Sequence, residues 1–146
     1  MFTITAHHNQ YLRLGQDTMQ AVLSVNVDTN ANLAPAPLAL GIALDRSGSM
    51  EGAKMRAALE GAIQVVQALD ENMAFAVVTF NDRADILFGP AMGTKENKRR
   101  AVQALQMVRA NGGTCMSTAL HAIVDKFGHD STRAVKILFL TDGKNE

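Results

Sequence analysis

Residues 38–50 read LALGIALDRSGSM, and this stretch decides the fold. Its apolar first part, up to Leu44, would bury both faces of an extended chain, which is typical of a central strand in a parallel sheet covered by helices. The strand ends at Asp45, and a polar, glycine-containing turn leads from there toward a helix. In open α/β sheets, ligands bind outside the carboxyl ends of the strands. This turn is therefore the first place to look for a functional site.

The sequence after this stretch alternates between helical and extended hydrophobic patterns. The expected elements are a strand at 38–44, a helix at about 52–70, strands at 73–80 and 84–88, a helix from Thr94 to about 109, a helix that includes 120–127 and a strand at 134–140. We expect Asn111-Gly112-Gly113 to end the second helix. In the third helix, one face carries Leu120, Ile123, Val124 and Phe127. This alternation predicts a Rossmann-like, doubly wound, mostly parallel α/β sheet with helices on both faces.

The first quarter of the chain has a different pattern. Apolar and polar residues alternate over residues 2–7 and 21–28, which is typical of antiparallel strands with one buried face. A polar, proline-containing connector follows at 28–37. We therefore predict an N-terminal antiparallel β segment with its linker at 1–37, and an α/β domain at 38–146.

Composition excludes several classes of protein. Lys plus Arg and Asp plus Glu both number 14, so the surplus of cations that nucleic-acid binding needs is absent. A single cysteine excludes an internal disulfide framework and a cysteine-based zinc site. Apolar runs are far shorter than the ~20 residues of a membrane span, and the start, MFTITAHHNQ, does not resemble a signal peptide. We expect a soluble, cytoplasmic protein.

Polar side chains follow the first and the last of the predicted buried strands. Asp45, Ser47 and Ser49 come after the first buried strand, Asp142 comes after the last, and Thr114 starts a helix after Gly-Gly. Because the first and fourth strands of a doubly wound sheet are neighbours, we expect Asp45 and Asp142 to meet. An all-oxygen cluster suits a hard cation: Mg²⁺ first, with Ca²⁺ or Mn²⁺ as alternatives. A cation held mainly by hydroxyls would accept one more anionic oxygen from outside.

The order Asp45-x-Ser47-x-Ser49, then Thr114, then Asp142 resembles the metal-ion-dependent adhesion site (MIDAS) of von Willebrand factor type A domains, in the bacterial Asp-x-Ser-Gly-Ser-Met form. The resemblance covers residues 38–146. It implies that Ser47, Ser49 and Thr114 are direct metal ligands, and that Asp45 and Asp142 coordinate directly or through water. The remaining ligand would be a carboxylate of a partner protein. The resemblance thus implies a metal-dependent protein-binding module and not an enzyme.

One departure from the family concerns the end of the chain. Family domains continue past the equivalent of Asp142 with further strands, whereas this sequence stops at Glu146. The domain is therefore expected to be C-terminally incomplete, with 134–140 as an exposed apolar edge prone to association. A fragment, a truncated copy, or a chain that completes its sheet through a second copy in a homo-oligomer would each explain this. A remnant that functions only as an oligomer is one alternative.

Two enzymatic or nucleotide-binding alternatives remain open at this point. A Mg²⁺-dependent phosphotransferase would use Asp45 as its nucleophile, although Ser47 stands where such enzymes carry a second acid. A nucleotide-binding domain would need the glycine-rich spacing that the segment RSGSMEG lacks.

Four further features have alternative interpretations. Cys115 is a redox gate or a small buried residue, and the second is favoured. The adjacent His7 and His8 point to opposite faces of a strand, which disfavours a shared metal. Arg46 either shapes partner choice or is solvated. The basic cluster is a solvated face or a site for an anionic partner; it comprises Lys95, Lys98, Arg99 and Arg100.

Overall fold

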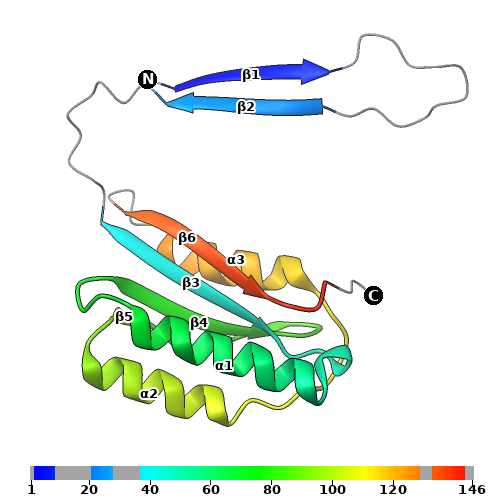
Figure 1. Ribbon diagram of the computed structural model, residues 1–146, viewed down its shortest axis with the longest axis vertical. Coiled ribbons are helices and arrows are strands. Elements are labelled where there is room, and N and C mark those ends of the chain that lie inside the picture. The colour runs from blue at the N-terminus through cyan, green and yellow to red at the C-terminus, as the bar shows by residue number, and fades with distance from the viewer. Residues whose placement is uncertain (1, 9–20, 28–36, 129–132, 144–146) are drawn as a thin grey trace, which may run out of the picture. The chain divides into compact units, whose positions relative to one another are not determined.

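The computed structural model describes residues 2–8, 21–27, 37–128 and 133–143. The chain separates into two compact units, Met1–Pro35 and Ala36–Glu146. In the first unit, β1 (Phe2–His8) pairs with β2 (Ala21–Val27) in antiparallel register, with Phe2 opposite Val27 (Figure 1). The alternating pattern predicted antiparallel strands over these residues, and the structure pairs them with each other.

The second unit is built on a sheet of four strands in the order β5-β4-β3-β6. Its strands are β3 (Leu38–Asp45), β4 (Ala74–Phe80), β5 (Ala84–Met92) and β6 (Ala134–Leu140). The central strand β3 runs parallel to both β4 and β6, and β5 is antiparallel to β4. The mostly parallel sheet is confirmed, and the first and fourth strands of the domain are neighbours.

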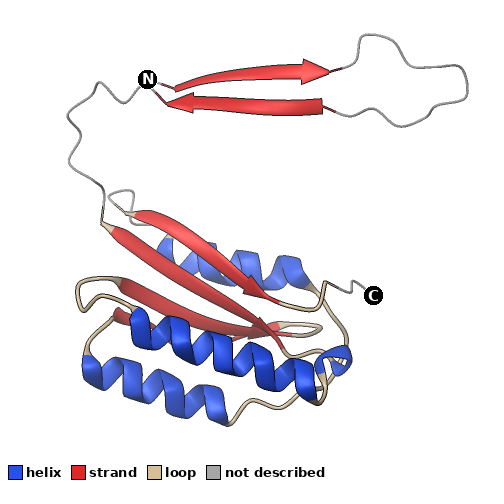
Figure 2. Cartoon of the chain, in the orientation of Figure 1, coloured by secondary structure: helices blue, strands red, loops and turns tan. Residues whose placement is uncertain are grey.

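Helices cover both faces of this sheet (Figure 2). A short 3-10 helix, η1 (Gly48–Met50), leads from β3 into α1 (Ala53–Ala68). Residues of α1 and of α2 (Lys95–Gln106) share one hydrophobic cluster with β3 and β4, whereas residues of α3 (Met116–Phe127) share a second cluster with the same two strands. The chain between each pair of parallel strands thus crosses over through helices, as the sequence pattern predicts.

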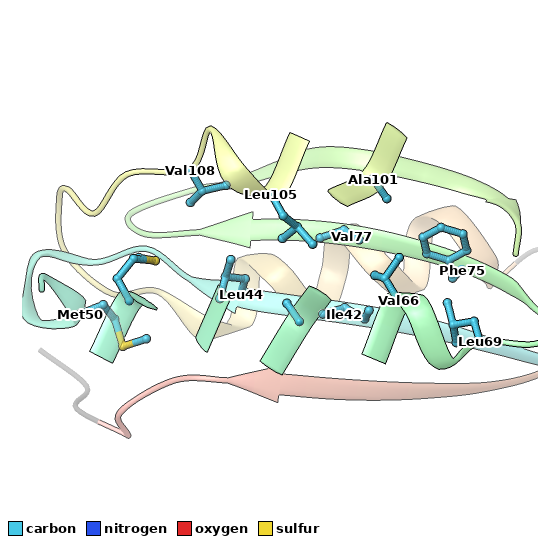
Figure 3. Close-up of a cluster of buried hydrophobic side chains, with 12 residues drawn as sticks. Ile42, Leu44, Met50, Val66, Leu69, Phe75, Val77, Ala101, Leu105 and Val108 are labelled. Carbon is cyan, nitrogen blue, oxygen red and sulfur yellow. The ribbon is translucent and has the colours of Figure 1, made fainter. Parts of the chain in front are cut away.

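The two faces of the sheet differ in the size of their side chains. Toward α1 and α2 the strands bury large residues such as Leu44, Phe75 and Val77 (Figure 3). Toward α3 they present mainly alanines, and at Gly41 a Cβ atom would lie 2.5 Å from Ile123 Cγ2. The small residues let α3 pack closely against the sheet.

Two predicted element ends need correction. β5 continues to Met92 instead of ending at 88, because Gly89-Pro90 and an irregular register with β4 hide the strand pattern. Helix α2 ends at Gln106, earlier than expected.

The buried face of α3 is narrower than its sequence pattern indicates. Leu120 and Val124 are 42% and 48% exposed, whereas Ala119, Ile123 and Phe127 are buried. These three residues are spaced i, i+4, i+8 and so lie in one row along the helix. In the described part of the fold, only this side of the helix is covered by the sheet. Among the described residues, no helix has the length and apolar character needed to cross a membrane.

Candidate functional site

The Asp45 carboxylate joins the ends of the two neighbouring parallel strands. Its side chain is fully buried; Oδ1 accepts a hydrogen bond of 2.8 Å from the Ser47 backbone N–H. Oδ2 accepts one of 2.7 Å from the Thr141 hydroxyl. Leu44 of β3 pairs with Leu140 of β6, so the next residue of each strand meets the other across the sheet edge. The parallel register therefore places Asp45 beside the segment that carries Asp142.

Hydroxyl groups extend this cluster from Asp45 to Asp142. Ser47 Oγ lies 3.2 Å from Ser49 Oγ, and Ser49 Oγ donates a 3.4 Å hydrogen bond to Asp142 Oδ1. The tight turn of η1 brings the two serine side chains together. Four of the five residues singled out from the sequence thus form one hydrogen-bonded group, in which Asp45 is joined through the Ser47 backbone N–H, across a separation of 97 positions from Asp45 to Asp142.

Thr114 lies in the loop between α2 and α3, and this loop is fastened to the turn after β3 through the backbone. The Gly48 N–H donates to Gly112 O at 2.8 Å, and the Asn111 N–H donates to Arg46 O at 2.7 Å. Among the residues that the structure describes, no side-chain hydrogen bond links Thr114 to the other four. The structure therefore places the loop of Thr114 at the site but leaves its hydroxyl outside the hydrogen-bonded group.

The glycine pair before Thr114 has a different role from the one predicted. Helix α2 ends well before it, so the pair does not terminate that helix. Gly112 has a φ of 78°, and a Cβ atom on it would lie 2.6 Å from Asp82 Oδ2. The Gly113 N–H donates to that same carboxylate oxygen at 3.0 Å. Glycine is needed here because the loop passes close to Asp82 in a left-handed conformation.

Arg46 connects three segments around the site. Its guanidinium donates to Asn111 Oδ1 at 2.6 Å and to Asp85 Oδ2 at 2.8 Å, and its side chain is 17% exposed. Asn81 Nδ2 also donates to Asn111 Oδ1, at 3.0 Å. The interpretation of Arg46 as a solvated side chain is wrong, because these bonds tie the turn after β3 to β5 and to the α2–α3 loop.

Sequence reasoning missed Lys54, a cation in direct contact with the site. Its ammonium donates to Asp142 Oδ2 at 2.6 Å and to the Ser49 carbonyl at 3.2 Å. Lys54 lies in the first turn of α1, where the helix dipole disfavours a positive charge. A lysine at the start of a helix that follows an acidic turn was the signal, since such a residue is expected to have a carboxylate partner.

The cysteine beside the site is partly exposed, so the prediction of a small buried residue is wrong. The Cys115 backbone N–H donates to Asn81 O at 2.7 Å, which holds the start of α3 against the end of β4. The Ser117 hydroxyl, 3.5 Å from Sγ, lowers the pKa of the Cys115 thiol.

Most of the predicted basic cluster is engaged within the fold. Lys98 Nζ donates to the carbonyls of Gln67 and Leu69 at the end of α1. Arg99 forms an exposed ion pair with Glu96 and lowers the pKa of that carboxyl through its hydrogen bond. The guanidinium of Arg100 lies 5.8 Å from the centre of the Phe88 ring. These contacts give three of the four cations structural partners.

The exclusion of a metal role for His7 and His8 stays a prediction.

The donor set of the site fits a hard divalent cation. The side-chain ligands that the site offers are carboxylate and hydroxyl oxygens, and no group of three or more His, Cys, Asp or Glu that could hold a metal ion occurs among the described residues. Metal–oxygen distances of about 2.1 Å in an octahedral site place adjacent ligands about 3.0 Å apart. The two oxygen–oxygen separations along Ser47, Ser49 and Asp142, 3.2 and 3.4 Å, are close to that spacing.

Comparison with known proteins tests the resemblance at the level of the family. A curated protein of Synechocystis, described only as uncharacterized, is 30% identical over 141 residues, which cover 94% of this chain and 33% of that protein. The chain thus spans about a third of the length of this relative. A family model of the von Willebrand factor type A domain matches residues 40–144.

Solved structures share the fold at lower identity. A von Willebrand factor type A protein from Catenulispora acidiphila has a TM-score of 0.66 and 22% identity, covering 93% of this chain and 32% of that one. The vWF domain of a type V pili tip protein from Porphyromonas gingivalis has a TM-score of 0.65 and 16% identity, with 77% and 40% covered. Proximal thread matrix protein 1 of the mussel byssus, with a zinc-occupied MIDAS motif, has a TM-score of 0.58 and 22% identity, with 77% and 30% covered. From the family match over residues 40–144, this chain belongs to the von Willebrand factor type A domain family.

Proposed function

We propose that this domain is a protein-binding module that works through a divalent cation. Ser47, Ser49 and Thr114 would supply hydroxyl ligands, and Asp45 and Asp142 would hold the ion directly or through water. Mg²⁺ is the cation we propose, because the ligands are hard oxygens. The ion would take an acidic side chain of the partner protein as its outer ligand, and the domain itself would catalyse no reaction.

The observation that carries this proposal is the hydrogen-bonded group that runs from Asp45 through Ser47 and Ser49 to Asp142. Asp45 is fully buried and Asp142 is 10% exposed in its side chain, so both charges are largely removed from water. Two partly desolvated carboxylates at one strand edge repel each other unless positive charge lies near them. Lys54 supplies one positive charge at Asp142, and a divalent cation would add the charge that Asp45 needs and retain a positive character toward an incoming carboxylate.

Two structural relatives support a binding role. The mussel byssus protein holds zinc at its MIDAS motif, and another relative is the tip protein of a pilus. From the first we extend to this chain a metal ion at the MIDAS motif, and from the second a role in contact with a partner. Pairing of β6 with a second copy, which would make the domain a homo-oligomer, stays a prediction; β6 has β3 as its one neighbour in the described sheet.

The same geometry disfavours a phosphotransferase. Both oxygens of Asp45 accept hydrogen bonds, from Ser47 and Thr141, and the side chain has no exposed surface. A nucleophilic carboxylate needs one oxygen free to reach the phosphorus atom. Asp45 is better suited to holding the turn and an ion than to attacking a substrate.

The test compares Asp45→Ala with the wild-type chain and with Asp125→Ala, which removes an exposed carboxylate from α3. At 1 mM Mg²⁺ and a Kd of about 0.1–1 mM, binding should stabilise the wild-type fold by roughly 0.4–1.4 kcal/mol. We expect the Mg²⁺-dependent rise in Tm, and the heat of binding in calorimetry, to disappear in Asp45→Ala and to persist in Asp125→Ala. Asp45→Asn, which keeps the shape of the side chain, serves if the alanine variant does not fold.

The proposal fails if the wild-type chain binds none of Mg²⁺, Mn²⁺ and Ca²⁺ in calorimetry. It fails equally if Asp45→Ala shows the same metal-dependent Tm rise as the wild type.

A further inference from the structure

Lys54 places a positive charge on the proposed metal ligands in the described part of the chain. Its Nζ atom contacts Asp142 Oδ2 at 2.6 Å, while the other oxygen of the same carboxylate accepts the Ser49 hydroxyl at 3.4 Å. The Ser49 carbonyl, 3.2 Å from Nζ, is a second acceptor of the ammonium. Lys54 therefore contacts two residues of the oxygen cluster at once.

The surroundings of Lys54 allow it to leave this position. Its side chain is 48% exposed, and it lines a cavity of about 390 Å³ between α1 and the end of β6, together with Asp142 and apolar residues such as Ala58 and Leu140. The ion pair is therefore held by one flexible, partly solvated side chain. A divalent cation that approaches Asp142 can therefore displace the Lys54 ammonium, because this side chain is not buried and fixed.

We propose that Lys54 is an internal competitor for the metal: its ammonium and the divalent cation are alternative occupants of the Asp142 carboxylate. This inference rests on the proposed function. Lys54 neutralises Asp142 before the ion binds, and the ion must displace it. Lys54 thereby sets the metal concentration at which the domain becomes able to bind its partner.

The charge of Lys54 predicts the direction and size of the effect. Removing a like charge a few ångströms from a divalent ion, at a partly exposed position, should tighten metal binding by about three- to tenfold. Because ions in solution screen this repulsion, the difference from wild type should shrink as NaCl is raised. A direct exchange further requires that the ammonium moves away from Asp142 when the ion binds.

The experiment measures Mg²⁺ affinity by calorimetry on the full chain for wild type, Lys54→Met and Lys54→Arg. Lys95→Met is the matched control, because it removes the same charge far from the site. Lys95 follows Thr94 at the start of α2, near the paired residues Met92 and Ala74 at the amino end of β4. We expect tighter binding in Lys54→Met only. In parallel, the Nζ resonance of Lys54 in ¹⁵N-labelled wild-type protein should shift on Mg²⁺ saturation, with that of Lys95 unchanged.

The outcomes separate this inference from the proposed function. If no variant and no wild-type sample binds metal, the proposed function has failed. If wild type binds Mg²⁺ but Lys54→Met binds with equal or lower affinity, the metal site stands and Lys54 is not a competitor. An unshifted Lys54 resonance in Mg²⁺-saturated wild type also overturns the competition, and this measurement needs no variant.

Discussion

The two ends of the parallel strands bury different kinds of residue. Among the described residues, the buried polar side chains all lie at the carboxyl ends of β3 and β4 or directly after them; they are Asp45, Ser47, Thr79 and Asn81. At the amino ends the same strands bury Ala39, Ala74 and Phe75. No buried side-chain nitrogen or oxygen in the described part of the chain lacks a hydrogen-bond partner.

This difference separates stability from function within one small domain. Burying a polar group costs free energy unless it is paired, and apolar burial is the less costly way to hold strands together. Both ends bury apolar residues, such as Phe75 at one and Leu44 and Phe80 at the other, but only the carboxyl end adds an internally paired polar cluster. We infer that the polar end is kept for the site, and that the apolar end stabilises the sheet on which the site is built.

The largest expected effect on stability comes from the apolar end. Phe75 is fully buried and stacks on Phe88 with ring centroids 5.3 Å apart. Phe75→Ala should lower the free energy of unfolding by about 3–5 kcal/mol through lost burial and a cavity, as measured by urea denaturation. Phe75→Leu, which leaves a smaller cavity, should lose less. If the folded Phe75→Leu variant had an altered Mg²⁺ affinity, packing at the amino end of the strands would also control the site, and the two ends would not be independent.

An intermediate effect is expected at Arg46. Arg46→Ala removes the bonds to Asn111 and Asp85 and should cost about 1–3 kcal/mol of unfolding free energy. Because these bonds fasten the loop that carries Thr114, Mg²⁺ binding should also weaken in calorimetry. Arg46→Lys should rescue only part of both losses, since an ammonium lacks the planar fork of donors. Unchanged metal affinity in Arg46→Ala would show that the loop keeps its place without this clamp.

The smallest effect is expected at Thr94, beside the amino end of β4. Thr94 Oγ1 accepts the Asn97 N–H at 3.3 Å and caps α2. Thr94→Ala should lower the free energy of unfolding by about 1 kcal/mol, seen as a small fall in Tm. The Mg²⁺ affinity should equal that of wild type. A weaker metal affinity in this variant would mean that the two ends are coupled through α2.

Much of the fold could be predicted from local patterns. The two-faced apolar run 38–44 and the helical spacing after it are properties of neighbouring residues, so the order of strands and helices followed from the sequence alone. The errors lie where local pattern and packing diverge. Gly89-Pro90 hides half of β5, and the apolar residues Leu120 and Val124 of α3 face away from the sheet in the described fold.

The candidate site was predictable in composition but not in its contacts. The topology rule for parallel sheets anticipated that the strand ends carrying Asp45 and Asp142 are neighbours, and in the structure Asp45 bonds to Thr141, the residue before Asp142. The sequence carried weaker signals for Lys54 and Arg46, because long side chains reach partners that are distant in the chain; Arg46 bonds to residues 39 and 65 positions away. Such pairings depend on the tertiary arrangement of loops.

By itself, the sequence determined which residue types meet at the strand ends and the kind of sheet that brings them there. The hydrophobic period, and with it the succession of strands and helices along the chain, is a property of neighbouring residues. Only the tertiary structure decided how the charges of the site are balanced. It placed the ammonium of Lys54 on Asp142 and the hydroxyl of Thr141 on Asp45. Hydrogen bonds, including those within ion pairs, need donor–acceptor distances of about 3 Å, so they form only after the backbone has brought distant segments to that range.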